Sequence, residues 1–243
     1  MSLHRAWDPS PEQLPRQDAL ELGMIPGVLP VIAAHNPTAR SSVSHKITAT
    51  FATPMDGYKR RLYHFESGLE YAVALEALLS GECHGLEIQL PAFRYLWRGK
   101  WKGHHFDLRI TRTDGHRIAV FVRNDASLAR VSTQAEIDAI FSHIPPGFCD
   151  QAVVVGSSHY SRVLQENVRR MWEATQLPDT DDDDVVLGMA RASRYWDIEG
   201  LISQCGMPRA RAWRATLRLI GARLLIADWH AMIDYPSRIK LAA

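Results

Sequence analysis

Alternating apolar and polar residues mark the middle of the chain as β structure. Residues 86–90 alternate strictly, and the same period of two returns on both sides of the Asp114-Gly115 pair. This period is typical of a strand that buries one face. Asp-Gly between two such stretches is a strong hairpin signal. We therefore expect strands at 86–90, 93–97, 105–110 and 118–122.

Helices are expected on both sides of these strands. Ser67 and Glu70 form a capping box, in which each side chain bonds to the backbone of the first turn. Gly81 is placed to end this helix. The continuous apolar run 152–155 indicates a fully buried strand. Apolar residues at helical spacing predict helices at 67–80, 133–142 and 161–175.

Residues 190–243 have the pattern of a small helical module. One helix is expected over 198–205 and a second over 208–220, with Gly206 between them and a candidate wing strand at 223–227. Two short helices joined by a glycine-containing turn are typical of a helix-turn-helix. The second helix carries basic residues that we expect to contact DNA: Arg209, Arg211, Arg214 and Arg218.

The remaining segments are poorly patterned. Prolines interrupt residues 1–60, which we interpret as an extended arm with a short helix at 18–22 and a short strand at 47–51. The run Lys59-Arg60-Arg61 is either a phosphate contact or a solvated turn. Asp179 and Asp181 to Asp184 favour a solvated linker. The expected divisions are an arm at 1–60, a core domain at 61–178, an acidic linker at 179–189 and a helical domain at 190–243.

Composition and charge place the chain among ordinary globular proteins. Its 243 residues are 46% apolar and carry a net charge of +1. Locally, residues 94–130 hold nine Lys and Arg against three Asp, and residues 186–243 hold nine against four acids. Two basic surfaces separated by an acidic segment fit a two-part DNA binder. Three distant cysteines and the lack of a long apolar run lead us to expect a soluble cytoplasmic protein.

The central pattern resembles that of metal-dependent nucleases. A helix carrying Glu66 and Glu70 precedes a strand with Asp107 and a strand that ends at Arg123. This order is similar to the PD-(D/E)XK nuclease fold of restriction enzymes, and more specifically to the TnsA family of transposon end-cleaving endonucleases. In that family, too, a Gln-x-Pro motif precedes an aromatic strand and a glycine turn. The resemblance covers about residues 62–175. It implies an α/β fold with a restriction-endonuclease-like α/β/α core and a small helix-turn-helix or winged-helix-like C-terminal domain.

The resemblance assigns the catalytic centre to Asp107 and a helix glutamate. Either Glu66 or Glu70 would join Asp107 in binding magnesium, which prefers oxygen ligands. Where the family has an acidic or amide residue and a lysine, this chain has Phe121 and Arg123. A benzyl group has no lone pair for a metal, and a guanidinium binds phosphate but serves poorly as a base. The candidates for a displaced ligand are Glu87 and Asp125.

The sequence predicts a DNA-binding protein with a TnsA-like nuclease fold and an inactive catalytic centre, acting in transposition or DNA processing. Arg123 would bind phosphates beside the degenerate site. One alternative is an active magnesium-dependent endonuclease with Asp107 and Glu70 as ligands. The other is a protein-interaction subunit of a DNA-processing complex. The expected partners are DNA and other transposition or DNA-processing proteins, with no membrane.

Overall fold

The computed structural model describes residues 24–35 and 46–242 and centres on a mixed sheet in the order β3-β6-β7-β8. Strand β6 runs antiparallel to β3 and β7, and β8 runs parallel to β7. The expected hairpin across Asp114-Gly115 is confirmed, with Leu108 paired to Val120. The strands are Cys83–Ile88 (β3), Leu108–Arg112 (β6), Arg117–Val122 (β7) and Gln151–Val155 (β8).

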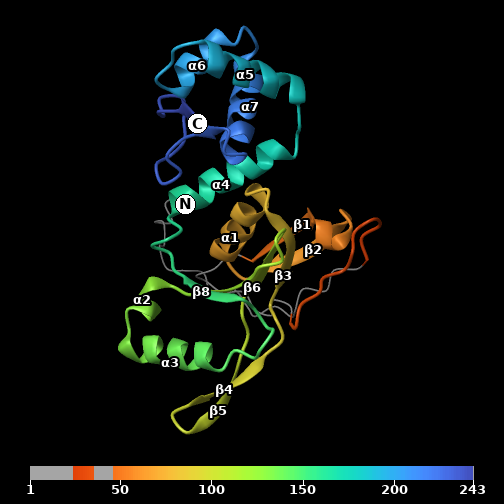
Figure 1. Cartoon of the computed structure of the whole chain (residues 1–243), viewed down its shortest axis with the longest axis vertical. Coiled ribbons are helices and arrows are strands. Elements are labelled where there is room, and N and C mark those ends of the chain that lie inside the picture. Colours follow the sequence, from red (N-terminus) through yellow and green to blue (C-terminus); the bar gives the residue numbers. More distant parts are fainter. Residues whose placement is uncertain (1–23, 36–45, 243) are drawn as a thin grey trace, which may run out of the picture.

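Helices cover both faces of this sheet, as Figure 1 shows. Val73 and Leu75 of α1 share an apolar cluster with Leu108 and Val120 on one face. On the other face, Ile137 of α3 belongs to a second cluster. The predicted helices are confirmed, because caps and apolar spacing are local signals. Their bounds are Gly68–Leu79 (α1), Val131–Ser142 (α3) and Arg162–Thr175 (α4), with the short α2 at Asp125–Leu128.

Strand β8 differs from the expectation of full burial. Its apolar residues, Ala152 to Val155, are only half-buried. Within the described residues β8 lies at the end of the sheet order, so it has a strand neighbour on one side only. An apolar run therefore identified the strand correctly but not its position in the sheet.

A two-stranded hairpin projects from the connection between β3 and β6. It consists of Phe93–Trp97 (β4), which matches the predicted strand, and Lys100–His104 (β5). Figure 1 shows it at the end of the molecule opposite the C-terminal helices. The sequence pattern does not predict β5, because its residues up to Gly103 are all exposed and lack an apolar alternation.

The N-terminal region adds a second small sheet. Ile47–Ala52 (β1) pairs with Arg60–Phe65 (β2) around the 3-10 turn Pro54–Asp56 (η1), which confirms the strand expected at 47–51. The segment around Leu29 runs beside Arg61. Arg61, one residue of the basic run 59–61, forms an ion pair with Asp56 at 2.5 Å and is thus paired within the fold. The helix expected at 18–22 lies outside the described residues.

The segment predicted to be an acidic linker is instead a helix. Asp179 caps α5 by accepting a hydrogen bond from the backbone of Asp182 at 3.1 Å. Acidic side chains in the first turn also interact favourably with the positive end of a helix, which explains the charge block without a solvated linker. The C-terminal elements are Thr180–Ala192 (α5), Ile198–Gln204 (α6), Arg209–Gly221 (α7), Leu225–Ile226 (β9) and Lys240–Leu241 (β10).

One apolar cluster joins the sheet to the C-terminal helices. Helix α4 lies between α1 and these helices in Figure 1, and its buried Val168 and Met171 belong to the same cluster as Leu108 and Ile220. The predicted pair of helices at 198–205 and 208–220 is confirmed as α6 and α7. No helix within the described ranges is long and apolar enough to cross a membrane.

Candidate functional site

Glu70 is held at the start of α1 by the predicted cap. Ser67 Oγ accepts a hydrogen bond from the Glu70 backbone at 3.2 Å, and the Glu70 carboxylate accepts one from the Ser67 hydroxyl at 2.8 Å. The carboxylate also accepts a bond from the backbone of Glu66 at 2.9 Å, one residue before the helix cap. Only 5% of Glu70 is exposed, and burial raises its pKa. The residue is therefore both a helix cap and a buried acid.

Asp107 provides the second acid, half-buried immediately before β6. Its Oδ2 accepts a hydrogen bond from the Val122 backbone at 2.7 Å. Burial and, to a smaller degree, the nearby charge of Glu70 raise the pKa of Asp107 to about 7. We call Glu70 and Asp107 the acidic pair. Two nearby carboxyl groups that are shielded from water favour a state in which one of them holds a proton.

Gln89, the first residue of the Gln-x-Pro motif, bonds to both members of the acidic pair. Gln89 Nε2 donates to Glu70 at 3.4 Å, and the backbone of Gln89 donates to the Asp107 carbonyl at 2.8 Å. The backbone of Gln89 adopts a φ of 45°, which is rare for a residue with a side chain. This conformation places the amide beside the pair. A positive φ has no sequence signal at a glutamine, so the pattern could not reveal it.

Glu66 lies beside a lysine and a histidine from the N-terminal segment. It is 3.9 Å from Lys46 Nζ and 3.6 Å from His35 Nε2. The His35 ring meets the His105 ring edge-on, with centroids 5.0 Å apart. The structure thus distinguishes the two glutamates: Glu70 has the larger effect on the pKa of Asp107, whereas Glu66 contacts Lys46 and His35. His35 and Lys46 both belong to the segment expected to form an extended arm.

Phe121 and Arg123 do not lie where the predicted strand faces put them. Phe121 is 5% exposed and belongs to the apolar cluster on the α3 face. Val120 and Val122 instead share the cluster of the α1 face, on which the acidic pair lies. Regular alternation fails at Asp107 because β6 begins only at Leu108. The β7 positions on the face of the acidic pair are therefore occupied by valines, and Phe121 is a core residue of the opposite face.

Arg123 lines a small cavity on the α3 face. Its guanidinium lies 4.8 Å from the Phe121 ring centroid. The cavity has a volume of about 130 Å³ and is also lined by Tyr95, His104 and Glu136. The positive charge of Arg123 nevertheless lowers the pKa of Asp107, so the guanidinium interacts electrostatically with the acidic pair. It lies close to the pair without joining it.

Neither candidate for a displaced ligand reaches the pair. Glu87 accepts two hydrogen bonds from Arg109, both at 2.7 Å, directly across β3 and β6. Asp125 accepts hydrogen bonds from the hydroxyls of Ser157 and Ser158 at the start of α2. Within residues 24–35 and 46–242, no group of three or more His, Cys, Asp or Glu side chains is placed to hold a metal ion. Two carboxyl groups, one of which is engaged in capping, do not fit the oxygen shell that magnesium requires.

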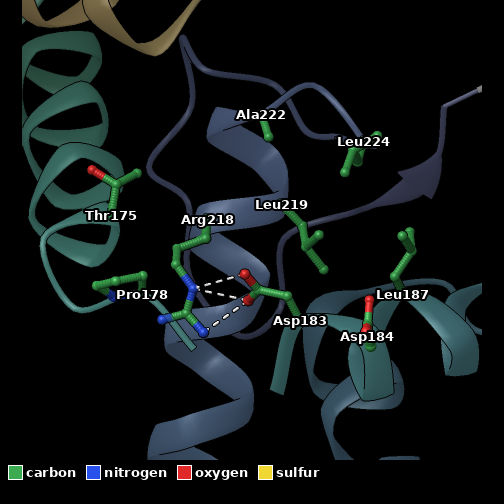
Figure 2. A pocket seen from close by; sticks show the side chains of 9 residues that line it. All are labelled: Thr175, Pro178, Asp183, Asp184, Leu187, Arg218, Leu219, Ala222 and Leu224. Atoms are coloured by element: carbon green, nitrogen blue, oxygen red, sulfur yellow. Dashed lines mark hydrogen bonds and ion pairs between the residues drawn. The ribbon is translucent and has the colours of Figure 1, made fainter. Parts of the chain in front are cut away.

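The arginines of α7 are largely paired within the fold. Arg211 contacts Asp182 at 2.9 and 2.5 Å, and Arg218 contacts Asp183 at 2.8 Å and the Leu177 carbonyl at 2.9 Å. Figure 2 shows the Arg218 fork facing Asp183. Arg209 binds Glu199 at 2.5 Å. Arg214 is exposed and forms no ion pair with any described residue. The predicted DNA-contacting stripe thus forms contacts between helices, because the acidic start of α5 packs beside α7.

No protein-family model matches this chain, and no curated protein is significantly similar to it.

Proposed function

We propose that the protein binds DNA through a restriction-endonuclease-like fold whose catalytic centre is degenerate, in the manner of a TnsA-like protein that has lost its metal site. The observation that carries the proposal is the acidic pair. Glu70 lies at the start of the first helix, α1, and Asp107 lies just before β6, the second strand of the central sheet. Along the chain, α1 is followed by the antiparallel strands β3, β6 and β7, then by helix α3 and the parallel strand β8. That is where such nucleases bring their helix glutamate and strand aspartate together.

The degenerate centre follows from what faces the pair. Val122 occupies the neighbouring strand on the same face, and Glu87 is neutralised by Arg109. The pair therefore has neither the third oxygen ligand nor a strand lysine. Asp107 keeps its place because its carboxylate accepts the Val122 backbone hydrogen bond. This role ties two strands together without any metal.

The C-terminal helices support a helix-turn-helix or winged-helix assignment. Helices α5, α6 and α7 precede a short hairpin, in which Leu241 pairs with Leu225. Because the arginines of α7 are mostly paired within the fold, we infer that this part holds the protein together or contacts other proteins of a DNA-processing complex. DNA contact then falls to the other end of the molecule.

A cleavage assay with a binding arm tests this function. We expect purified protein to retard duplex DNA and to leave supercoiled plasmid intact with magnesium or manganese. Nicking that disappears in Asp107→Asn would overturn the inactive centre. Failure to bind any DNA would overturn the DNA-binding assignment.

The competing function is an active endonuclease, and Lys46 favours it. Its ammonium lies 3.9 Å from Glu66 and lowers the pKa of Glu70, so a lysine from the arm stands near the acidic pair. If nicking is seen, Lys46→Ala should abolish it together with Asp107→Asn. Lys240→Ala removes an exposed lysine at the other end of the molecule and serves as the matched control.

A further inference from the structure

The β4–β5 hairpin carries charge of one sign only. From residue 88 to residue 106 the sequence contains no aspartate or glutamate. In the same stretch Arg94, Arg98, Lys100 and Lys102 are all exposed. Among the residues that the structure describes, only Lys102 of these four has an acidic partner, Glu136 at 2.8 Å. A local excess of cations on a projecting element attracts a polyanion.

The shape of the hairpin suits a groove of duplex DNA. Its strands pair from Phe93 with His104 to Trp97 with Lys100, which makes a narrow antiparallel ribbon. Five residues per strand span roughly 17 Å. The ribbon stands clear of the sheet in Figure 1. A two-stranded ribbon of this kind is one of the elements that the major groove admits.

Aromatic side chains support the cations. The Arg94 guanidinium lies 5.3 Å from the Trp101 ring centroid, and that of Arg98 lies 5.2 Å from the Trp97 ring centroid. Trp101 is 56% exposed. Stacking on a ring limits the rotamers of a long side chain, so less entropy is lost when the guanidinium binds a phosphate. An exposed tryptophan between cations also offers contact to sugars and bases.

The tip of the ribbon carries a strained arginine. Arg98 has a φ of 48° and Gly99 one of 73°, the pattern of a two-residue turn with both central residues in the left-handed region. Asn-Gly is strongly preferred in such turns, because asparagine tolerates a positive φ better than most residues. An arginine there costs stability. Strain at an exposed tip points to a role for the guanidinium outside the fold.

The ribbon leads directly to the candidate site. His104, the last residue of β5, is followed by His105, Phe106 and Asp107. Exposed Arg123 shares a cavity with Tyr95 and His104 at the base of the ribbon. A duplex lying along the ribbon would therefore reach the edge of the sheet at which the acidic pair lies. We propose that the β4–β5 ribbon enters a groove of duplex DNA and supplies the main phosphate contacts; this inference rests on the proposed DNA-binding function.

The first test removes the cations at the tip. Fluorescence anisotropy with a labelled duplex would be measured for Arg98→Ala/Lys100→Ala over a range of salt concentrations. We expect binding about tenfold weaker and a salt dependence flatter by about one to two units of slope, because each lost phosphate contact releases one counterion fewer. The control Arg162→Ala/Arg191→Ala removes two exposed cations away from the ribbon and should bind like the parent chain.

A second variant separates binding from folding. Arg98→Asn relieves the strained turn, so we expect a higher melting temperature together with weaker duplex binding. A purely structural role for Arg98 predicts no loss of binding.

The outcomes distinguish the two proposals. A chain that binds no duplex overturns the proposed function and the ribbon with it. If the parent binds and the ribbon variant keeps its affinity and slope, the ribbon assignment fails while DNA binding stands. Equal losses in the ribbon and control variants, or a preference for single-stranded DNA, would also overturn groove entry by the ribbon.

Discussion

At the scale of single residues, Asp107 combines a structural bond with an electrostatic cost. Its carboxylate accepts the Val122 backbone hydrogen bond, yet burial and the Glu70 charge raise its pKa to about 7. An aspartate in an unfolded chain ionises near 3.9. Between about pH 4 and about pH 7 the folded chain therefore holds a proton that the unfolded chain has released. Because the unfolded state binds fewer protons in this range, the contribution of Asp107 to the free energy of unfolding falls as pH rises.

We expect Asp107→Asn to be more stable than the parent chain above neutral pH, by up to roughly 4 kcal/mol, the equivalent of a three-unit shift in pKa. The asparagine oxygen can still accept the Val122 bond. Near pH 4 this advantage should vanish, because the parent carboxyl group is then protonated in the folded chain. Urea unfolding followed by circular dichroism at both pH values would measure the difference. An advantage that does not change with pH would show that Asp107 ionises normally in the fold.

At the scale of elements, α7 depends on the acidic start of α5. Arg218 is 7% exposed and binds Asp183 and the Leu177 carbonyl, so it joins the end of α4 to α5. Its role in the fold is that of an internal brace. Arg214, four residues earlier on the same helix, is exposed.

We expect Arg218→Ala to lower the free energy of unfolding by about 3 kcal/mol, because it leaves a half-buried carboxylate and a carbonyl without their partner. Arg214→Ala is the matched control and should change it by less than about 0.5 kcal/mol. Urea unfolding monitored by tryptophan fluorescence would compare the two variants. Equal stabilities would mean that the Arg218 pair is solvated in solution and that this arginine is free for DNA.

At the scale of the whole molecule, the central sheet and the C-terminal helices share one apolar cluster. A buried amide adds to it. Asn167 of α4 donates to the carbonyls of Trp229 and Ala231 at 2.9 and 2.7 Å and accepts from the Ile233 backbone at 3.1 Å. These bonds hold the segment between β9 and β10 on α4. The two parts are therefore coupled through α4.

We expect the chain to unfold in a single cooperative transition. Far-ultraviolet circular dichroism and tryptophan fluorescence should give coincident urea curves, since neither part can lose its packing on α4 without exposing the other. Two separate transitions would show that the C-terminal helices form an independent domain.

The sequence by itself determined most elements. Period-two alternation, the Asp114-Gly115 turn, the Ser67 cap and helical apolar spacing each act over a few residues, and these signals located the core strands and helices. The resemblance pointed to Asp107 and left the choice between Glu66 and Glu70 open. Local signals suffice here because hydrogen bonding and side-chain direction within an element depend on its own residues.

Only the tertiary structure decided which side chains lie next to one another. It placed Phe121 in the core of the α3 face and Asp107 near Glu70, and it brought Lys46 and His35 to the site from the arm. It also turned the acidic segment into the partner of Arg211 and Arg218 of α7. Burial and ion pairing join residues far apart in the chain, and their energies depend on distance and solvent exposure, which a linear pattern does not contain.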